Sequence, residues 1–513
     1  MSAGDAMETQ LLIEKYSDRL DGVLNCFDRV VMFGSLHPFC YAKGMTNYLY
    51  QHKIRIFDYA QFAEPLREEI RANAEALAAE AGLTIEFVRQ RNFRKEDRIA
   101  RILKTRGTQP GLVHIFSAME PCGAYQPWHD KQSHHTFLKY TDGKCLHYYF
   151  YFIDADLGLC YLRVPTWCPF RLQFYTNGHA WLAAQLTRRG IAYELRDNAF
   201  THIADYTVAN ELAAHLDITP LHAQLDGLAQ RYCPLIQRLQ LSVQWSLWQV
   251  EYATDLVFKQ SADLQAFYPL LLETLIHTVK PDDIATFLGQ KLHGNYQGEA
   301  GNRFNTRPLG TRIKHSMQPV SLKLYDKFGL ILRIEVTVNE VSFFKQYREV
   351  QHRDGTHETK YAPMKKTIYS LPALREQLLA ANQRYLKFIS DIETPQVGVQ
   401  RLNQISQSKT DNQHTYKGFN LFAEDDAALC RLLLRGEFAI SGLTNRALRA
   451  LLPSKNTGQV SRLLKRLRVH GLLKKVGRCY KYYLTEFGRQ VTTMALKLRE
   501  MVVIPTLARL AAA

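Results

Sequence analysis

The 513-residue sequence predicts a multidomain protein of the mixed α/β and α+β classes. Three observations support this fold class. Strand-like and helix-like patterns alternate through residues 1–140, strand-like runs around one helix fill residues 141–262, and helices with a short hairpin make up residues 418–513. A chain of this length usually forms three or four domains, and a hydrophobic fraction of 46% supplies side chains for several cores.

Residues 1–140 are predicted to form an α/β sheet domain. Apolar, β-rich runs (DRVVMFGSL, HKIRIFDY, LTIEFVRQ and GLVHIFSAME) are separated by helical patterns, notably EPLREEIRANAEALAAEAG, which ends at Gly82. Strands interleaved with helices indicate a largely parallel sheet covered on both faces. The sequence has no glycine-rich phosphate loop after these strands, so we expect a structural or docking role here.

Residues 141–262 are predicted to form a mixed sheet with acidic residues at strand ends. The runs HYYFYFID, LCYLRVP and FRLQFYTNG indicate three strands, AWLAAQLTRRG a helix, and IAYELRDNAF a fourth strand. The later segment QWSLWQVEYATDLVF has a helical pattern. Asp154 ends the first strand, Asp197 ends the fourth, and Glu251 lies on the later helix. Asp156 competes with Asp154, and Asp255 competes with Glu251.

This order of elements resembles the start of an RNase H-like fold. The set of Asp154, Asp197 and Glu251 is similar to the catalytic triad of DDE transposases and related nucleases. The resemblance implies that these carboxylates bind Mg²⁺ or Mn²⁺, which prefer oxygen ligands, and that the ions support phosphodiester transfer. The alternative is a mixed sheet domain in which Asp154 and Asp156 form a turn and Asp197 belongs to a helix cap.

Residues 263–392 are predicted to add a β-hairpin and a helical block. In VSLKLYDKFGLILRIEVTVN, apolar and polar residues alternate on both sides of Lys327-Phe328-Gly329, which indicates a hairpin. Its YDK and LRIE runs are similar to stretches of rolling-circle replication initiators, which nick DNA through a tyrosine. The resemblance offers Tyr325 as that nucleophile. The sequence lacks the histidine pair of one major initiator class, so we expect Tyr325 to be an ordinary strand residue.

The segment from Arg446 to Arg489 is strongly basic. Twelve lysines and arginines stand there against one acid, Glu486, in a chain whose formal net charge is +16. Within it, SKNTGQVSRLLKRLRVHGLL places apolar residues on one helical stripe, at positions Val460, Leu463, Leu464 and Leu467. The basic side chains of that helix therefore point away from the stripe, and such a surface suits a polyanion.

The helix LTNRALRALLP, the basic helix and the hairpin KKVGRCYKYYLT together resemble a winged-helix domain of MarR-like transcription regulators, over residues 418–513. The resemblance implies binding to double-stranded DNA, or to RNA. The residues expected at that interface are Lys455, Asn456, Gln459, Arg462, Lys465 and Arg466 on the helix, and Arg478 and Lys481 on the hairpin. Residues 393–417 are polar and nearly lack aromatics, so they are predicted to form a flexible linker.

The sequence as a whole predicts a DNA-binding, metal-dependent strand-cleaving or strand-transfer protein of the transposase or recombinase type. Two alternatives remain open: a non-catalytic winged-helix transcription regulator, and a tyrosine-dependent rolling-circle-type initiator. Nine scattered cysteines without a C-x-x-C pair, and the lack of a signal-like or membrane-length apolar run, predict a cytoplasmic, nucleoid-associated protein without a membrane partner. We also expect a homo-oligomer on DNA, because end-joining enzymes commonly act as dimers or larger assemblies.

Overall fold

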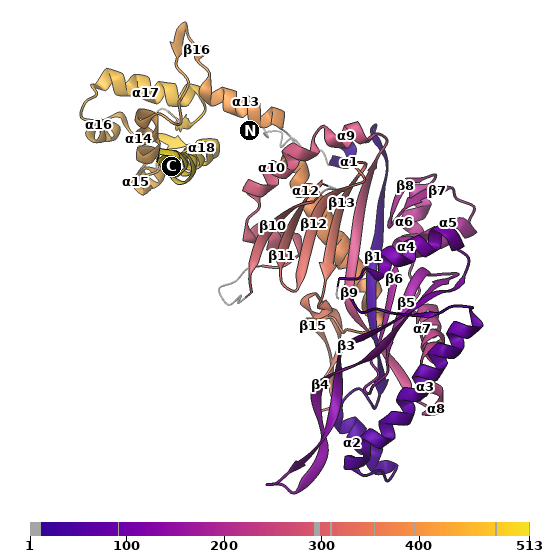
Figure 1. The fold of residues 1–513 in the computed structure, drawn as a ribbon. Helices are drawn as coiled ribbons and strands as arrows, with labels where there is room; N and C mark the ends of the chain where they lie inside the picture. Colours follow the sequence, from indigo (N-terminus) through magenta and orange to yellow (C-terminus); the bar gives the residue numbers. More distant parts are fainter. Residues whose placement is uncertain are drawn as a thin grey trace. The chain divides into compact units, whose positions relative to one another are not determined.

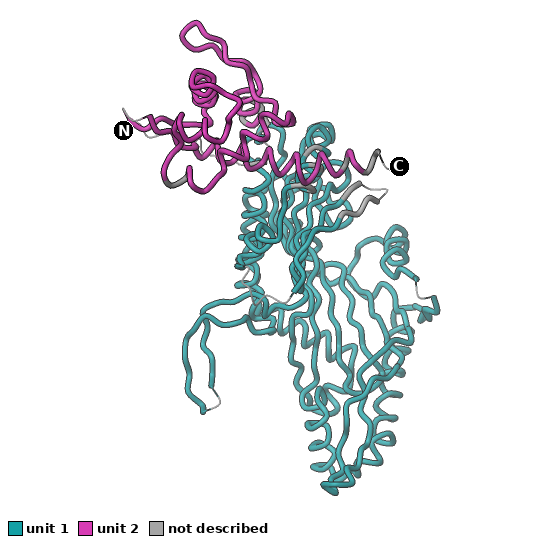
Figure 2. Tube along the Cα trace, turned by 90° about the vertical axis from the view of Figure 1, so that its left-hand side faces the viewer, with its two compact units in different colours: residues 1–393 teal, residues 394–513 magenta. Residues whose placement is uncertain are grey.

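The computed structural model describes residues 12–90, 92–291, 298–307, 310–352, 354–392, 395–477 and 480–511. They belong to two compact units, unit 1 (residues 1–393) and unit 2 (residues 394–513), which Figure 2 colours separately. Both units combine helices with strands, and unit 1 contains a large mixed sheet. The predicted mixture of sheet and helix is confirmed at this coarse level.

Unit 1 is built on one eleven-stranded sheet with the order β10-β11-β12-β13-β9-β1-β6-β5-β4-β3-β2 (Figure 1). The strands are β1 (Leu20–His37), β2 (Ile85–Phe87), β3 (Gly111–Asp130), β4 (His135–Asp154), β5 (Gly158–Pro165), β6 (Leu172–Asn177), β9 (Ser242–Phe258), β10 (Ala300–Arg307), β11 (Gly310–Met317), β12 (Val320–Lys327) and β13 (Ile331–Val338). Neighbouring strands are antiparallel except β2 and β3, which are parallel. The largely parallel sheet predicted for residues 1–140 is therefore wrong, because long hairpins rather than helical crossovers join most neighbours.

Among the described residues of unit 1, two short hairpins lie outside this sheet, formed by β7 (Tyr193–Arg196) with β8 (Ala199–Ile203) and by β14 (Lys345–Gln351) with β15 (His357–Pro363). The helices of unit 1 are α1 (Leu12–Lys15), α2 (Ala42–Gln51), η1 (Ile56–Asp58), α3 (Tyr59–Glu80), α4 (Lys95–Arg106), α5 (Gly178–Arg188), α6 (Tyr206–Ala214), α7 (Ile218–Tyr232), α8 (Leu235–Arg238), α9 (Ser261–Gln265), α10 (Tyr268–Thr278), α11 (Pro281–Phe287), η2 (Val341–Phe343), η3 (Ile368–Ser370) and α12 (Leu371–Ile392).

The separate domains predicted at 1–140, 141–262 and 263–392 all contribute strands to this one sheet. β4 crosses the predicted boundary between residues 140 and 141, and β9, from the second segment, pairs with β13, from the third. The expected fourth strand, β7, pairs only with β8, and β3 lies beside β4 instead. These elements therefore do not form the RNase H-like arrangement, in which the fourth strand joins the first.

The segment QWSLWQVEYATDLVF, predicted as a helix, forms most of strand β9. This strand is central in the sheet, and its residues from Val250 to Phe258 are buried or partly buried on both faces. A strand buried on both faces loses the two-residue alternation, so spacings such as Trp245–Trp248–Tyr252 imitate a helical period. The Val, Thr, Tyr and Trp content of the segment favours the strand.

One face of the sheet packs against helices and forms the largest hydrophobic core. Helices α3, α7 and α12 contribute Leu66, Leu225 and Leu378 to it, and β13 contributes Leu332 and Ile334. The opposite face is covered in part by α5 and α6, which pack on β1, and by α4, which packs on β3 and β4. Because successive strand residues point to opposite faces, the side chains that alternate with the core residues lie on this second face, called here the polar face.

Unit 2 begins with α13 (Pro395–Ser406) and the hairpin β16 (Lys409–Asp411) and β17 (His414–Tyr416). It continues with α14 (Glu424–Leu433), α15 (Gly436–Ser441), α16 (Asn445–Leu451), α17 (Thr457–Val469), the hairpin β18 (Leu473–Lys475) and β19 (Tyr482–Leu484), α18 (Glu486–Lys497), the π-helix η4 (Leu498–Val503) and α19 (Ile504–Ala511). Ile405 packs into the core of this unit with Phe419, so the predicted linker at 393–417 contains ordered structure. The composition of this segment is polar because most of the described side chains of α13 are exposed, and a polar composition is also typical of a flexible linker.

The apolar stripe predicted for the basic helix is confirmed, and two other helices of the unit begin at capping threonines. Thr444 caps α16 by accepting a hydrogen bond from the amide of Ala447 (3.1 Å), and Thr485 caps α18 through the amide of Gly488 (2.8 Å). Val460, Leu464 and Leu467 of α17 are buried in the core, as the apolar stripe predicts.

Candidate metal centre

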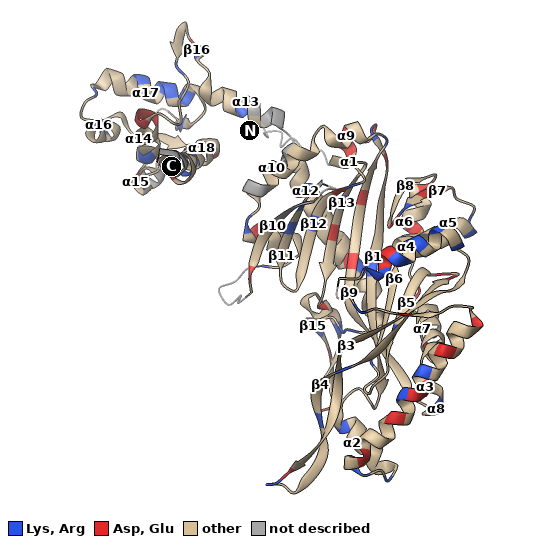
Figure 3. Ribbon diagram, in the orientation of Figure 1, with Lys and Arg blue, Asp and Glu red and all other residues tan. Residues whose placement is uncertain are grey.

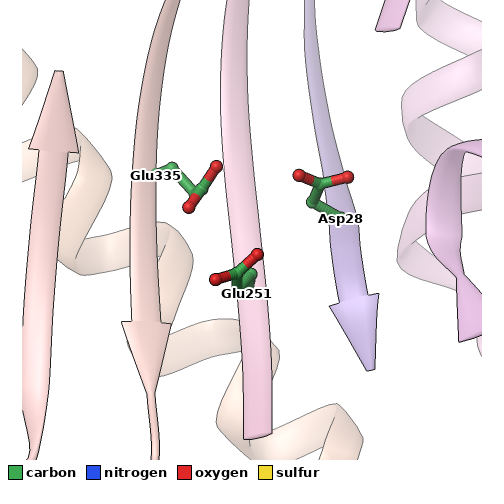
Figure 4. A group of neighbouring side chains, drawn as sticks. All are labelled: Asp28, Glu251 and Glu335. Carbon is green, nitrogen blue, oxygen red and sulfur yellow. The ribbon is translucent and has the colours of Figure 1, made fainter. Parts of the chain in front are cut away.

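Three carboxylates from three adjacent strands converge at the centre of the sheet. Asp28 lies on β1, Glu251 on β9 and Glu335 on β13, and Figure 4 shows the three side chains above these strands. One carboxylate oxygen from each lies within 4.8 Å of an oxygen from each of the other two. Like charges at this spacing repel unless cations neutralise them, so the cluster requires a counter-charge.

A β-bulge in β1 brings Asp28 into the cluster. Phe27 pairs with Tyr252 of β9 and Val30 pairs with Val250, so two residues of β1, Asp28 and Arg29, lie opposite the single residue between them on β9. That residue is Glu251. The extra residue turns Asp28 and Arg29 both towards the polar face, because the alternation changes parity at the bulge.

Buried Arg333 fixes the position of Asp28. The guanidinium of Arg333 donates two hydrogen bonds to Asp255 (2.6 Å each), and its Nη1 lies 3.3 Å from Asp28 Oδ2. Asp28 also accepts hydrogen bonds from the side-chain amides of Asn198 (2.7 Å) and Asn177 (2.9 Å). Charge-assisted bonds from several directions hold this carboxylate in one orientation.

The same contacts keep both aspartates ionised. Burial alone would raise the pKa of Asp28, but Arg333, with His179 and Asn198, outweighs burial and holds that pKa well below its ordinary value. Burial opposes ionisation of Asp255 too, yet Arg333 and His179 lower its pKa to about 2. Both groups are therefore carboxylates at neutral pH, which is the form that binds a metal ion.

Lys323 of β12 supplies the counter-charge to the other two acids. Its Nζ lies 3.3 Å from Glu251 Oε1 and also donates to Glu335 Oε1. Burial, and next the proximity of Glu335, raises the pKa of Glu251 above its ordinary value. Ionisation of Glu251 is thus costly, and an added cation would relieve that cost.

Tyr325 borders the cluster on the same strand as Lys323. Its hydroxyl donates to Glu335 Oε2 at 2.7 Å, and it pairs across the sheet with Arg333. Burial, followed by the charge of Glu335, raises the pKa of Tyr325 well above its ordinary value. The phenol is therefore protonated at neutral pH, with a carboxylate in place to accept its proton.

The turn between β7 and β8 covers one side of the cluster. Asp197 occupies the left-handed region at this turn (φ +59°), and the next residue, Asn198, bonds both Asp28, through its side chain, and Arg333, through its carbonyl (2.9 Å). Lys327 donates to the side chain of Asn198. Burial and the charge of Arg333 lower the pKa of Lys327 to about 8.

The predicted triad of Asp154, Asp197 and Glu251 is brought together only in part. Glu251 belongs to the carboxylate cluster, and Asp197 precedes a residue that contacts it. Asp154 instead accepts hydrogen bonds from the amides of Asp156 (2.8 Å) and Leu157 (3.0 Å), as in the alternative that assigns it to a turn. Among the described residues, the acids close enough to share an ion are Asp28, Glu251 and Glu335.

Sequence reasoning missed Asp28 and Glu335 because it searched for acids at strand ends. Both residues lie inside strands, in the largely apolar runs NCFDRVVMF and LRIEV. An ionised side chain at such a position is costly unless it is paired, so an acid inside an apolar strand was the available signal. Asp255, the competing acid of the sequence analysis, pairs with Arg333 and supports the cluster.

The predicted nucleic-acid contacts of unit 2 fall into two groups. Lys455, Arg462 and Lys481 are exposed, without an ion-pair partner among the residues that the structure describes. Figure 3 colours the lysine and arginine positions along α17 blue. Asn456 and Gln459 cap the start of α17 by exchanging hydrogen bonds (2.9 and 2.8 Å), and both remain exposed.

Two of the other predicted contacts, Arg466 and Lys465, pair with acids of the same unit. Arg466 bonds Asp426 (3.2 Å) and the carbonyl of Gly418, and its guanidinium lies 3.8 Å from the ring centre of Phe419. Lys465 pairs with Asp411. Arg466 thus holds α17 to the preceding chain rather than presenting a free charge. Arg478 lies outside the described residues.

Comparison with family models, with curated proteins and with solved structures finds no significant match to this chain. Among the described helices, none is both long and apolar enough to span a bilayer.

Proposed function

We propose that unit 1 is a divalent-metal-dependent nucleic-acid strand-cleaving or strand-transfer module, and that unit 2 is a winged-helix domain that binds double-stranded DNA. The observation that carries the first proposal is the convergence of Asp28, Glu251 and Glu335 on the polar face. All the donors are carboxylate oxygens, which favour Mg²⁺ or Mn²⁺ over softer ions. Oxygens bound to one Mg²⁺ lie about 3 Å apart when adjacent and about 4.2 Å apart when opposite, so the three side chains would have to draw closer together to bind one ion.

The chemistry at such a site is a phosphodiester transfer. A bound ion polarises a phosphoryl oxygen and lowers the pKa of the attacking water. Lys323 lies between Glu251 and Glu335 and neutralises their charges. When a bound cation neutralises these carboxylates instead, the Lys323 side chain would be free to bind the incoming phosphate. Arg29, exposed opposite Glu251, provides a second positive charge on the open side.

A plasmid-nicking assay tests the cleavage proposal. We expect the full-length protein to nick supercoiled DNA with Mn²⁺ or Mg²⁺, and Glu251→Gln and Glu335→Gln to lose that activity by at least about a hundredfold. Asp156→Asn is the matched control, because Asp156 is a half-exposed acid that pairs with Arg188 at a turn. Nicking that persists in both glutamine variants would remove the cluster from the reaction.

A second candidate mechanism uses Tyr325 as the nucleophile. The observation in its favour is the 2.7 Å hydrogen bond from the Tyr325 hydroxyl to Glu335. The phenol oxygen would form a bond to phosphorus as the bond to the leaving sugar oxygen breaks, while Glu335 takes the phenolic proton. A protein–DNA adduct that survives denaturation, and that Tyr325→Phe abolishes, would select this route. Nicking by Tyr325→Phe at the rate of the unchanged protein would select attack by water.

The proposal for unit 2 rests on the exposed basic residues of α17 and the hairpin that follows it. A winged helix inserts such a helix into the major groove. Arg462→Ala should weaken duplex binding by roughly tenfold and reduce the salt dependence by about one counterion, while the melting temperature stays the same. Arg466→Ala should instead lower the melting temperature, because Arg466 bonds Asp426 and the Gly418 carbonyl. Equal duplex binding by Arg462→Ala and the unchanged protein would contradict the proposal.

A further inference from the structure

An exposed aromatic and arginine cluster lies on the polar face beside the carboxylates. Trp248 of β9 is 51% exposed, and its ring centre lies 4.7 Å from that of Phe33 on β1. The guanidinium of Arg171 lies 4.0 Å from the centre of the Phe33 ring and 5.9 Å from that of Trp248. Trp248 lies three residues before Glu251, which is about 10 Å along β9.

A second irregularity in the pairing of β1 with β9 exposes this tryptophan. Val31 pairs with Gln249, but the next residue, Met32, pairs with Leu247, so Trp248 has no partner on β1. The neighbours Leu247 and Val250 are buried, whereas Trp248 projects from the sheet. A large aromatic side chain kept in water at an unpaired position of a central strand indicates a binding surface, because burial would stabilise it.

A cavity of about 450 Å³ opens next to this cluster. Phe33, Arg171 and Arg163 line it, together with Tyr140, His147 and Trp167. Arg163 is mostly buried, its Nη1 lies 3.5 Å from Glu120 Oε2, and its Nε has no hydrogen-bond partner among the described residues. A cavity of this size, with aromatic walls and arginine donors, suits a planar heterocycle next to a phosphate.

Basic and aromatic side chains continue from the cavity towards the carboxylates. Tyr161 and Tyr175 stack with their ring centres 5.0 Å apart, and the guanidinium of exposed Arg29 lies 5.4 Å from the centre of the Tyr175 ring. Arg29 is the residue that the bulge places opposite Glu251. The polar face thus offers alternating stacking surfaces and positive charges between the cavity and the candidate metal centre.

We propose that this surface binds single-stranded nucleic acid next to the scissile phosphate, with a base stacked on Trp248 and Arg171 and phosphates on Arg29 and Arg163. This inference rests on the proposed cleavage function and names its substrate as a single strand. A base can stack on a side chain only when it is free of its own duplex stack, and each base has a ring face, so the contact tolerates any sequence.

The test measures oligonucleotide binding without turnover. Full-length protein in EDTA is titrated with labelled oligo-dT and oligo-rU, while excess unlabelled duplex occupies unit 2. Trp248→Ala should weaken single-strand binding about 5- to 150-fold, and Trp248→Phe should keep most of it. The protein's duplex affinity and melting temperature should not change, because Trp248 is exposed. A difference between the two oligomers identifies DNA or RNA as the preferred strand.

Two controls separate this inference from the proposed function. Asp156→Asn should bind the oligomers as the unchanged protein does, because Asp156 pairs with Arg188 at a turn and belongs to neither proposed site. If Glu251→Gln nicks plasmid normally while Trp248→Ala loses single-strand binding, the cleavage proposal fails and the stacking surface stands. Single-strand affinity that is the same in Trp248→Ala and the unchanged protein, or that is undetectable in both, overturns the inference.

Discussion

At the scale of single residues, the candidate centre depends on how each acid is balanced. Arg333 balances Asp28 and Asp255, and Lys323 balances Glu251 and Glu335. The two cations differ in kind. Arg333 is fully buried in a rigid fork of hydrogen bonds, whereas Lys323 carries a compact charge on a flexible stem that can move away. The structure therefore pairs one fixed structural cation with one exchangeable cation.

The raised pKa of Glu251 makes metal binding depend on pH. Its ionisation is opposed first by burial and then by Glu335. An ion needs the ionised form, so affinity for Mn²⁺ should fall about tenfold per pH unit once the pH drops below that raised pKa. Calorimetric titration with Mn²⁺ between pH 5 and 8 measures this. An affinity that is constant across the whole range would contradict the assignment of Glu251 as a ligand.

Removal of Arg333 should unfold the protein more readily. Arg333→Met leaves Asp28 and Asp255 buried without their cation, which should cost roughly 3–5 kcal/mol of unfolding free energy at pH 7. The folded-state pKa of Asp255 lies below its unfolded value, so its share of stability is present above about pH 4 and is lost as the pH falls towards 2. The substituted protein should therefore lose less stability than the unchanged protein on acidification. Denaturant titrations of both proteins at pH 7 and pH 3 measure the two unfolding free energies. If the unfolding free energy falls equally in Arg333→Met and in the unchanged protein, this prediction is wrong.

At the scale of elements, irregularities in the strands create the functional surface. One bulge in β1 places Asp28 and Arg29 opposite Glu251, and a second irregularity exposes Trp248. The alternation of apolar and polar residues describes regular strands, so it predicted neither the bulge in β1 nor the irregularity at Trp248. The sequence did predict the β4-β5-β6 succession and the hairpin of β12 and β13 around Phe328. These depend on local turn chemistry, which few residues determine.

The β7–β8 turn distinguishes the observed centre from the predicted triad. Asp197 adopts a left-handed conformation there (φ +59°), which asparagine also accepts readily, and the adjacent Asn198 makes the contacts to Asp28. Asp197→Asn should leave the melting temperature unchanged. Its nicking rate should stay within about twofold of that of the unchanged protein. Asn198→Ala, by contrast, removes two hydrogen bonds to Asp28 and should lower Mn²⁺ affinity roughly tenfold. Loss of nicking in Asp197→Asn alone would restore that aspartate as a ligand.

At the scale of the whole molecule, the chain joins two units that carry different charges and cores. Unit 1 holds the carboxylate cluster of Asp28, Glu251 and Glu335 inside its sheet. Unit 2 has exposed lysines and arginines along α17 and the following hairpin. The sequence predicted the helices of the basic segment because they are short, local and amphipathic. It predicted the sheet of unit 1 poorly because strands far apart in the chain, such as β1, β9 and β13, become neighbours. Pairing of that kind leaves no local pattern, and so the partners of Glu251 were missed.

The central claim is that Asp28, Glu251 and Glu335 bind one divalent ion, and direct Mn²⁺ binding to the full-length protein tests it. Electron paramagnetic resonance or calorimetry should detect a site whose affinity falls at least about tenfold in Glu335→Gln and in Glu251→Gln, with the Asp156→Asn control unchanged. The melting temperature of each variant, measured alongside, shows that the fold persists. Mn²⁺ affinity that is equal in Glu335→Gln, Glu251→Gln and the unchanged protein would contradict the account.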